Sequence, residues 1–146
     1  MSAPDITEPI RDALLGDTFI TGLLGAYLGS FPIFTRRPVP GDAPYPMLVV
    51  SMDITIRDED GVNDFRPMIV RDGAVYHTNE LPDNYRLVDT IAQGVRRLFH
   101  RQRNSITVPG WTVSDIQASI PVNVSVEQDK ITGRVVELSV RTARLA

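Results

Sequence analysis

The segment 84–102 constrains this fold most, because its apolar residues recur at the period of an α-helix. Asp83 or Asn84 is placed to cap the first turn, and arginines near the end complement the helix dipole. Such a helix buries one face, so the chain must supply a second layer against which it packs. The apolar face is made of Leu87, Val88, Ile91, Ala92, Val95, Leu98 and Phe99.

Three segments alternate apolar and polar residues with a period of two, which indicates half-buried strands. The first, 47–56, places Leu48, Val50, Met52, Ile54 and Ile56 on one face. The second, 120–127, has Ile120, Val122, Val124 and Val126 as its expected inward set. The third follows a hairpin turn predicted over 128–133, and its inward set is Val136, Leu138 and Val140.

Two further strands are expected over 66–77 and 111–117. Asp72-Gly73 permits either a tight hairpin or a bulge in the first of them, and we favour one interrupted strand. Pro121 predicts that the strand over 120–127 lies at a sheet edge or carries a bulge, because proline cannot donate to a central ladder.

The N-terminal third predicts two short helices and a long connection. Thr7 is a candidate cap for a helix that stops at Gly16, and Asp17 restarts a short helix. Five of the 11 prolines lie in 29–46, which indicates an extended connection. The sequence therefore predicts one α+β domain over 1–146, with a mainly antiparallel four-stranded sheet and helices packed on one face.

Composition excludes several classes of protein. The 146-residue chain has no cysteine, so it has neither disulfides nor a cysteine nucleophile, and its two histidines cannot form a histidine-rich metal site. The net charge of −3 argues against a general polyanion binder. No stretch is apolar enough to cross a membrane, and the first residues do not resemble a signal peptide, so we expect synthesis in the cytoplasm.

No catalytic or cofactor-binding motif is present in the sequence. The phosphate-binding glycine loops, the GxSxG elbow and the HExxH helix are all missing. His77 beside Tyr76 and Glu80 is better explained as a surface residue than as part of a catalytic dyad. The acidic run 58–64 lacks the ligand spacing of a calcium loop and is expected to be solvated. We expect no enzyme activity, no cofactor and no metal.

Four features together resemble the tail-completion or tail-terminator proteins of long-tailed bacteriophages and gene transfer agents. These are the helical start over 10–15, the proline-broken loop that leads into the strand at 43–50, the single amphipathic helix over 87–99, and the closing strand over 133–141. The resemblance runs from about residue 10 to residue 144. It implies a structural virion protein, located at the neck of the tail and carrying no catalytic site.

The resemblance also implies partners. Members of this family form a homohexameric ring on the head-proximal end of the tail tube, stop its polymerisation and present a surface to the head–tail connector proteins. DNA passes through the ring without specific binding, and an acidic protein suits that role. Two alternatives stay open: a head–tail connector or stopper, and a small nucleic-acid-binding module that uses the arginines of 96–103.

Two sets of residues are the candidates for assembly. We expect subunits to meet through the sheet edges and the loop 29–46, with arginines of the long helix pairing with acidic partners. The acidic loop is expected to lie at the ring lumen or rim, because crowded carboxylates need water and counter-ions. The interface set is Pro38, Pro40, Pro44, Arg96, Arg97, Arg101, Arg103, Pro121, Arg141 and Arg144, and the lumen or rim set is Asp58, Glu59, Asp60 and Asp64.

Overall fold

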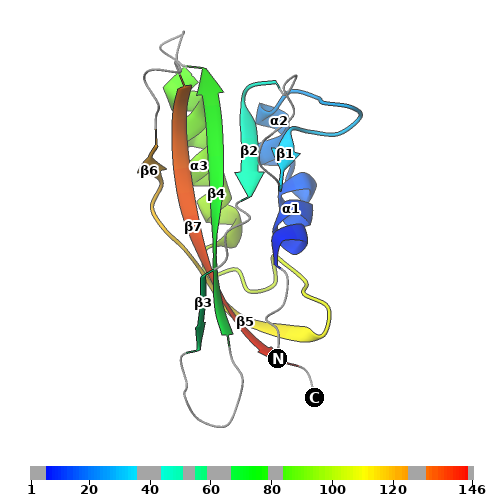
Figure 1. The fold of residues 1–146 in the computed structure, drawn as a ribbon. Helices are drawn as coiled ribbons and strands as arrows, with labels where there is room; N and C mark the ends of the chain where they lie inside the picture. Colours follow the sequence, from blue (N-terminus) through cyan, green and yellow to red (C-terminus); the bar gives the residue numbers. More distant parts are fainter. Residues whose placement is uncertain are drawn as a thin grey trace.

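A computed structural model describes residues 6–35, 44–50, 55–58, 67–78, 84–124 and 131–144. The described part combines helices with one curved sheet (Figure 1). The elements in chain order are α1 (Thr7–Gly16), α2 (Thr18–Leu23), β1 (Ile33–Phe34), β2 (Met47–Val50), β3 (Thr55–Asp58), β4 (Pro67–Thr78), α3 (Asn84–Phe99), β5 (Trp111–Ala118), β6 (Val122–Asn123) and β7 (Ile131–Arg144).

The sheet is larger than the sequence predicted. Its main path runs β1-β2-β4-β7-β5, while β3 pairs with β4 and β6 pairs with β7. β1 lies parallel to β2, and the other described pairs are antiparallel. The mixed helix and strand content and the single small domain are therefore confirmed, but the four-stranded antiparallel sheet is wrong. The parallel pair was missed because β1 has only two residues, too few to show a period.

β4 and β7 form the central ladder of the sheet. Their register runs without a shift from Met68 opposite Arg141 to Thr78 opposite Ile131. Gly73 lies within this ladder, directly opposite Val136. The expected break at Asp72-Gly73 is therefore wrong, because both residues stay paired with β7 and the strand continues through them. β7 also begins at Ile131, so the end of the predicted turn over 128–133 is strand, and residues 128–130 lie outside the described residues.

β5 and β6 follow one another along the same side of β7 and are separated by an irregular segment. The register with β7 shifts between Val113 and Asp115, and it shifts by one residue again between Ala118 and Val122. The second shift places Val122 opposite Val135, whereas the inward residues of β7 are its neighbours Val136 and Leu138. The prediction that Ile120 and Val122 face inward is wrong for this reason, since a one-residue shift exchanges the two faces of a strand. The edge position predicted by Pro121 is confirmed.

The core lies between one face of the sheet and the three helices. Leu48, Val75, Ile116, Val136 and Leu138 belong to the same face by register, and all of them join one buried cluster with the helices. That cluster also receives Val88, Ile91, Val95 and Phe99 from α3, Ile10 and Leu14 from α1, and Ile20 from α2. The helical pattern of 84–102 is confirmed on its apolar side. Burial on both faces of β2, where Met47 and Val49 are also buried, was not foreseen.

The helix ends differ from the prediction in small ways. α3 ends at Phe99 because Arg101 takes a φ of 58° and donates its backbone N–H to the carbonyl of Ile116, 2.8 Å away. His100 supports the same junction, since its Nδ1 accepts a hydrogen bond from the backbone N–H of Ala118 at 3.0 Å. Ile6, and not Thr7, occupies the cap position of α1. Asp17 caps α2 as predicted, accepting from the N–H of Phe19.

Candidate assembly surfaces

The contact between α2 and α3 uses one of the predicted interface arginines. The guanidinium of Arg97 lies 4.7 Å from the ring centroid of Phe19, a cation–π distance. Gly94 allows the ring to lie this close, because a Cβ there would stand 2.9 Å from Cε1 of Phe19. Phe19 is nevertheless 43% exposed. Arg97 therefore has a partner within its own chain. The sequence does not predict this contact, because it depends on how α2 packs against α3.

The other arginines of this region lie in different surroundings. Arg96 is half-buried, and its Nε is buried without a hydrogen-bond partner in the structure. Arg101 and Arg103 lie in the turns that follow α3 and are exposed. The four arginines predicted to form one helix face thus divide between the helix itself and the segment after it.

An ion pair joins the polar side of α3 to the sheet. Nε of Arg134 lies 3.8 Å from Oδ1 of Asp89, and the Arg134 side chain is only 16% exposed. Nη1 of Arg134 also donates to the carbonyl of Gly133 at 2.8 Å and to Oδ1 of Asn123 at 3.3 Å. This cluster connects α3, β6 and β7. Sequence reasoning did not single out Arg134, because its position on the inward face follows only from the register of β7.

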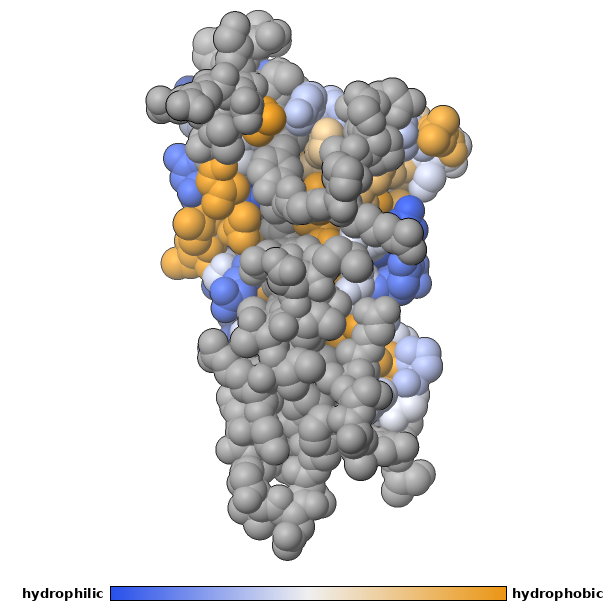
Figure 2. All heavy atoms as spheres, in the orientation of Figure 1, coloured by the Kyte–Doolittle hydropathy of each residue, from blue (hydrophilic) through white to orange (hydrophobic). Residues whose placement is uncertain are grey.

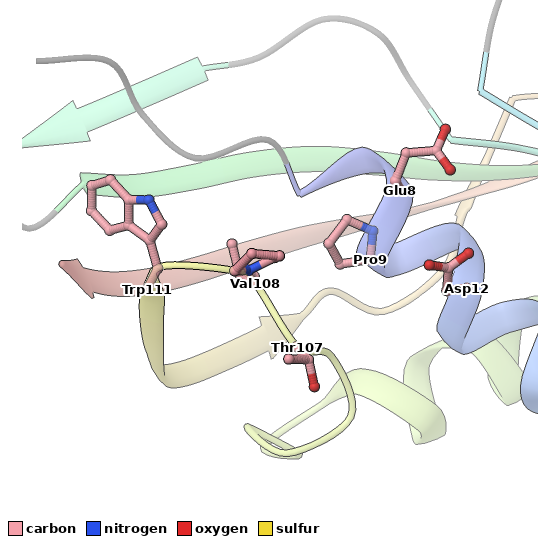
Figure 3. Close-up of a pocket in the computed structure, with 7 residues that line it drawn as sticks. Glu8, Pro9, Asp12, Thr107, Val108 and Trp111 are labelled. Carbon is pink, nitrogen blue, oxygen red and sulfur yellow. The ribbon is translucent and has the colours of Figure 1, made fainter. Parts of the chain in front are cut away.

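A hollow of about 410 Å³ lies between α1 and the segment that leads into β5. Figure 3 shows Pro9 and Val108 near its middle, with Trp111 beyond Val108 and the carboxylates of Glu8 and Asp12 on the α1 side. Thr107 and Pro109 complete the lining. The carboxylates and the indole ring lie toward opposite ends of the hollow, and each is a group that can bind a guanidinium or ammonium group. No sequence motif marks this hollow, because its two sides lie about a hundred residues apart.

Large apolar side chains are exposed at both edges of the sheet. Near β6, Ile120 is 72% exposed and Val122 is 58% exposed. Near β1, Leu28 is 84% exposed, and Tyr45 is also exposed. Figure 2 shows apolar surface on the side where Figure 1 places β6, and again on the opposite side near α2 and β1. Scattered apolar residues are common on surfaces, but clusters at sheet edges are typical of interaction sites.

Leu28 sits at the tip of a tight turn that precedes β1. Tyr27 and Ser30 form an antiparallel bridge with two backbone hydrogen bonds of 2.9 Å each. The two residues between them both have positive φ, 48° for Leu28 and 76° for Gly29. This is the pattern of a type I′ turn, in which asparagine or glycine is normal and leucine is not.

The remaining predicted interface and rim residues are placed in part. Pro44 and Pro121 are half-buried, and Arg141 is exposed on β7, where its carbonyl accepts from Oγ of Ser114. The backbones of Arg144 and Asp58 pair with Trp111 and Pro67. Pro38, Pro40, Glu59, Asp60 and Asp64 lie outside the described residues. The described residues of the two sets lie on separate elements: in α3 and the turns after it, before β2, before β6, and on β3 and β7.

No helix among the described residues is long and apolar enough to cross a membrane. Over the same ranges, no three histidine, aspartate or glutamate side chains group as a metal ion would require.

Comparison with known proteins shows the fold. No protein-family model matches the sequence, and no curated protein matches it either. Among solved structures, the chain is similar to one from the virion of a native gene transfer agent particle. The TM-score is 0.70, the identity is 9%, and the match covers 94% of each chain. The two chains therefore share an architecture over nearly their full lengths, with little sequence in common.

Proposed function

We propose that this chain is a structural protein of a phage-like virion. The observation that carries the proposal is the fold match to a gene transfer agent virion, which covers 94% of both chains. Exposed apolar side chains at both sheet edges support it, because an assembly protein must keep such surface for its neighbours. The protein acts by binding other copies and other virion proteins, and not by catalysis.

The narrower proposal is a tail terminator. In this role the chain forms a homohexameric ring at the head-proximal end of the tail tube, stops tube polymerisation and offers its other side to the connector proteins. The exposed arginines Arg101, Arg103 and Arg141, together with Arg96, Arg144, Pro44 and Pro121, contribute to contacts between subunits, whereas Arg97 lies on Phe19 of its own chain. Asp58, Glu59, Asp60 and Asp64 lie at the lumen or rim, where negative charge lets DNA slide through. The resemblance stated above and the fold match support this assignment together.

A head–tail connector is the second candidate, and particle morphology separates the two. Deleting the gene of a terminator should leave tubes of uncontrolled length, measured by electron microscopy of negatively stained lysates. Deleting a connector should leave tails of normal length that are not joined to heads. Normal, joined particles from the deletion strain would contradict both roles.

The nucleic-acid-binding module is tested on the purified protein. Arg101 and Arg103 are exposed and available for phosphates, whereas Arg97 already stacks on Phe19. A virion ring protein should give no salt-dependent shift of duplex DNA in a gel. A shift that declines steeply with salt and is lost when both exposed arginines become glutamine would favour the module instead.

A further inference from the structure

The turn at Tyr27–Ser30 contains Leu28, and packing within the subunit does not explain why a leucine occupies this position. Leu28 has a φ of 48°, in the left-handed region that is unfavourable for residues with a branched side chain. It is also 84% exposed, so its isobutyl group gains almost no packing within this subunit. Asparagine or glycine at this position would remove strain from the backbone and improve solubility. An exposed, strained apolar residue of this kind indicates a contact made outside the subunit.

The β6 edge offers a matching surface on the other side of the sheet. Ile120 and Val122 project from an edge segment in which the ladder with β7 is irregular. A neighbour cannot extend this edge as a long regular strand, so it must be bound through side chains. Residues 120–124 carry no charge, and neither do residues 27–30. Covering either surface therefore buries no charged side chain of these segments.

We propose that the Tyr27–Ser30 turn of one copy of this chain docks on the β6 edge of the next copy, with Leu28 packed against Ile120 and Val122. A second copy is the occupant because one chain carries both apolar surfaces, at opposite edges of one sheet (Figures 1 and 2). A head-to-tail contact covers both at once and leads to a closed ring when repeated by rotation. A two-fold contact of β6 with β6 would leave Leu28 uncovered. This contact would be one of the contacts between neighbouring subunits of the proposed ring. Only the closure of the ring rests on the proposed function.

The absence of cysteine makes this contact directly testable by cross-linking. A double variant, Leu28→Cys with Val122→Cys, should give covalent products beyond the dimer when treated with a short bismaleimide, both as purified protein and within particles. Each single variant should stay monomeric on a denaturing gel, because in a head-to-tail contact the two positions meet only each other. Both sites are exposed, so the variants should fold, which circular dichroism verifies.

The controls separate the possible contacts. Gln102→Cys with Val122→Cys offers an exposed thiol beyond the end of α3 and should give only the background of random collision. A dimer from Val122→Cys alone would overturn the proposal in favour of a two-fold contact. No product from the double variant, in solution and in particles, would also overturn it. Either failure leaves the deletion phenotype unchanged, so the proposed function is judged separately.

Discussion

At the scale of single residues, the proposed contact assigns Leu28 two opposite effects, a strained turn within the subunit and an apolar contact between subunits. Leu28 has a backbone conformation in the left-handed region. A residue other than glycine, asparagine or aspartate in this region lowers the free energy of unfolding by roughly 1–2 kcal/mol. Leu28→Asn should relieve part of that cost and raise the free energy of unfolding by about 0.5–1 kcal/mol. Urea denaturation of the dilute monomer measures the gain, and sedimentation at higher concentration should show weaker self-association.

Leu28→Ala is the matched control for this change. Alanine removes the apolar side chain but keeps the strain of a Cβ at positive φ, so we expect weaker association without the gain in stability. If Leu28→Asn left stability unchanged, the turn would not be strained. If neither variant altered association, Leu28 would have no role at the interface.

Among the elements, the packing of α2 on α3 depends on a small group of side chains. Phe19 lies against Gly94, and the guanidinium of Arg97 lies over the Phe19 ring. A double-mutant cycle of Phe19→Leu and Arg97→Gln should give a coupling energy of about 0.5–1 kcal/mol, since this cation–π pair is partly exposed. Chemical denaturation of the four proteins measures it.

A second cycle provides the control for that coupling. Arg86 lies on the same helix, about 16 Å from Arg97 at 1.5 Å per residue. Arg86 instead contacts the ring of Tyr85. Phe19→Leu combined with Arg86→Gln should be additive. A coupling energy of zero between Phe19 and Arg97 would contradict the cation–π contact. Arg97 would then be available to bind an acidic partner, as the sequence predicts.

Helices and strands whose apolar residues recur at a regular period could be predicted from the sequence. Irregular segments could not. α3 and β7 hold long unbroken patterns, and the apolar residues expected to face inward belong to the buried cluster or pack against it. The segment Ser119–Val124 also has a period of two, but the shift in register near Pro121 turns Val122 to the opposite face. A bulge depends on the partner strand, so nothing local in the sequence reports it.

The candidate site was less predictable than the fold, for a similar reason. The sequence marks Arg97 as polar, yet its contact with Phe19 depends on how α2 packs against Gly94. Leu28-Gly29 is not a turn dipeptide of the usual kind, so the tight turn could not be inferred. Side chains that come together from distant parts of the chain carry no common motif.

At the scale of the whole molecule, the proposed ring concentrates the acidic loop sixfold. Neutralising it by Asp58→Asn, Glu59→Gln and Asp60→Asn should leave ring formation intact but lower the number of infectious or gene-transferring particles by about tenfold or more, because DNA would bind to a less repulsive channel. Particle counts by microscopy, set against transfer titre, measure this ratio.

The control for that triple variant changes the same charge elsewhere. Asp12→Asn, Asp115→Asn and Glu137→Gln remove three carboxylates that are exposed or half-buried on the described surface. This variant should transfer DNA at the wild-type level if position, and not net charge, decides the effect. A wild-type titre from the loop variant would rule out a lumenal role for the loop.

The two register shifts along β5 and β6 have a consequence for how copies of this chain meet one another. A straight, apolar sheet edge is a template on which further chains add without limit, which leads to amyloid-like fibres. Here the pairing with β7 shifts between Val113 and Asp115 and again between Ala118 and Val122, so an arriving chain finds side chains to pack on but no long, uninterrupted strand to extend. Association of copies along this edge therefore depends on how their side chains fit together, and backbone pairing contributes little to it.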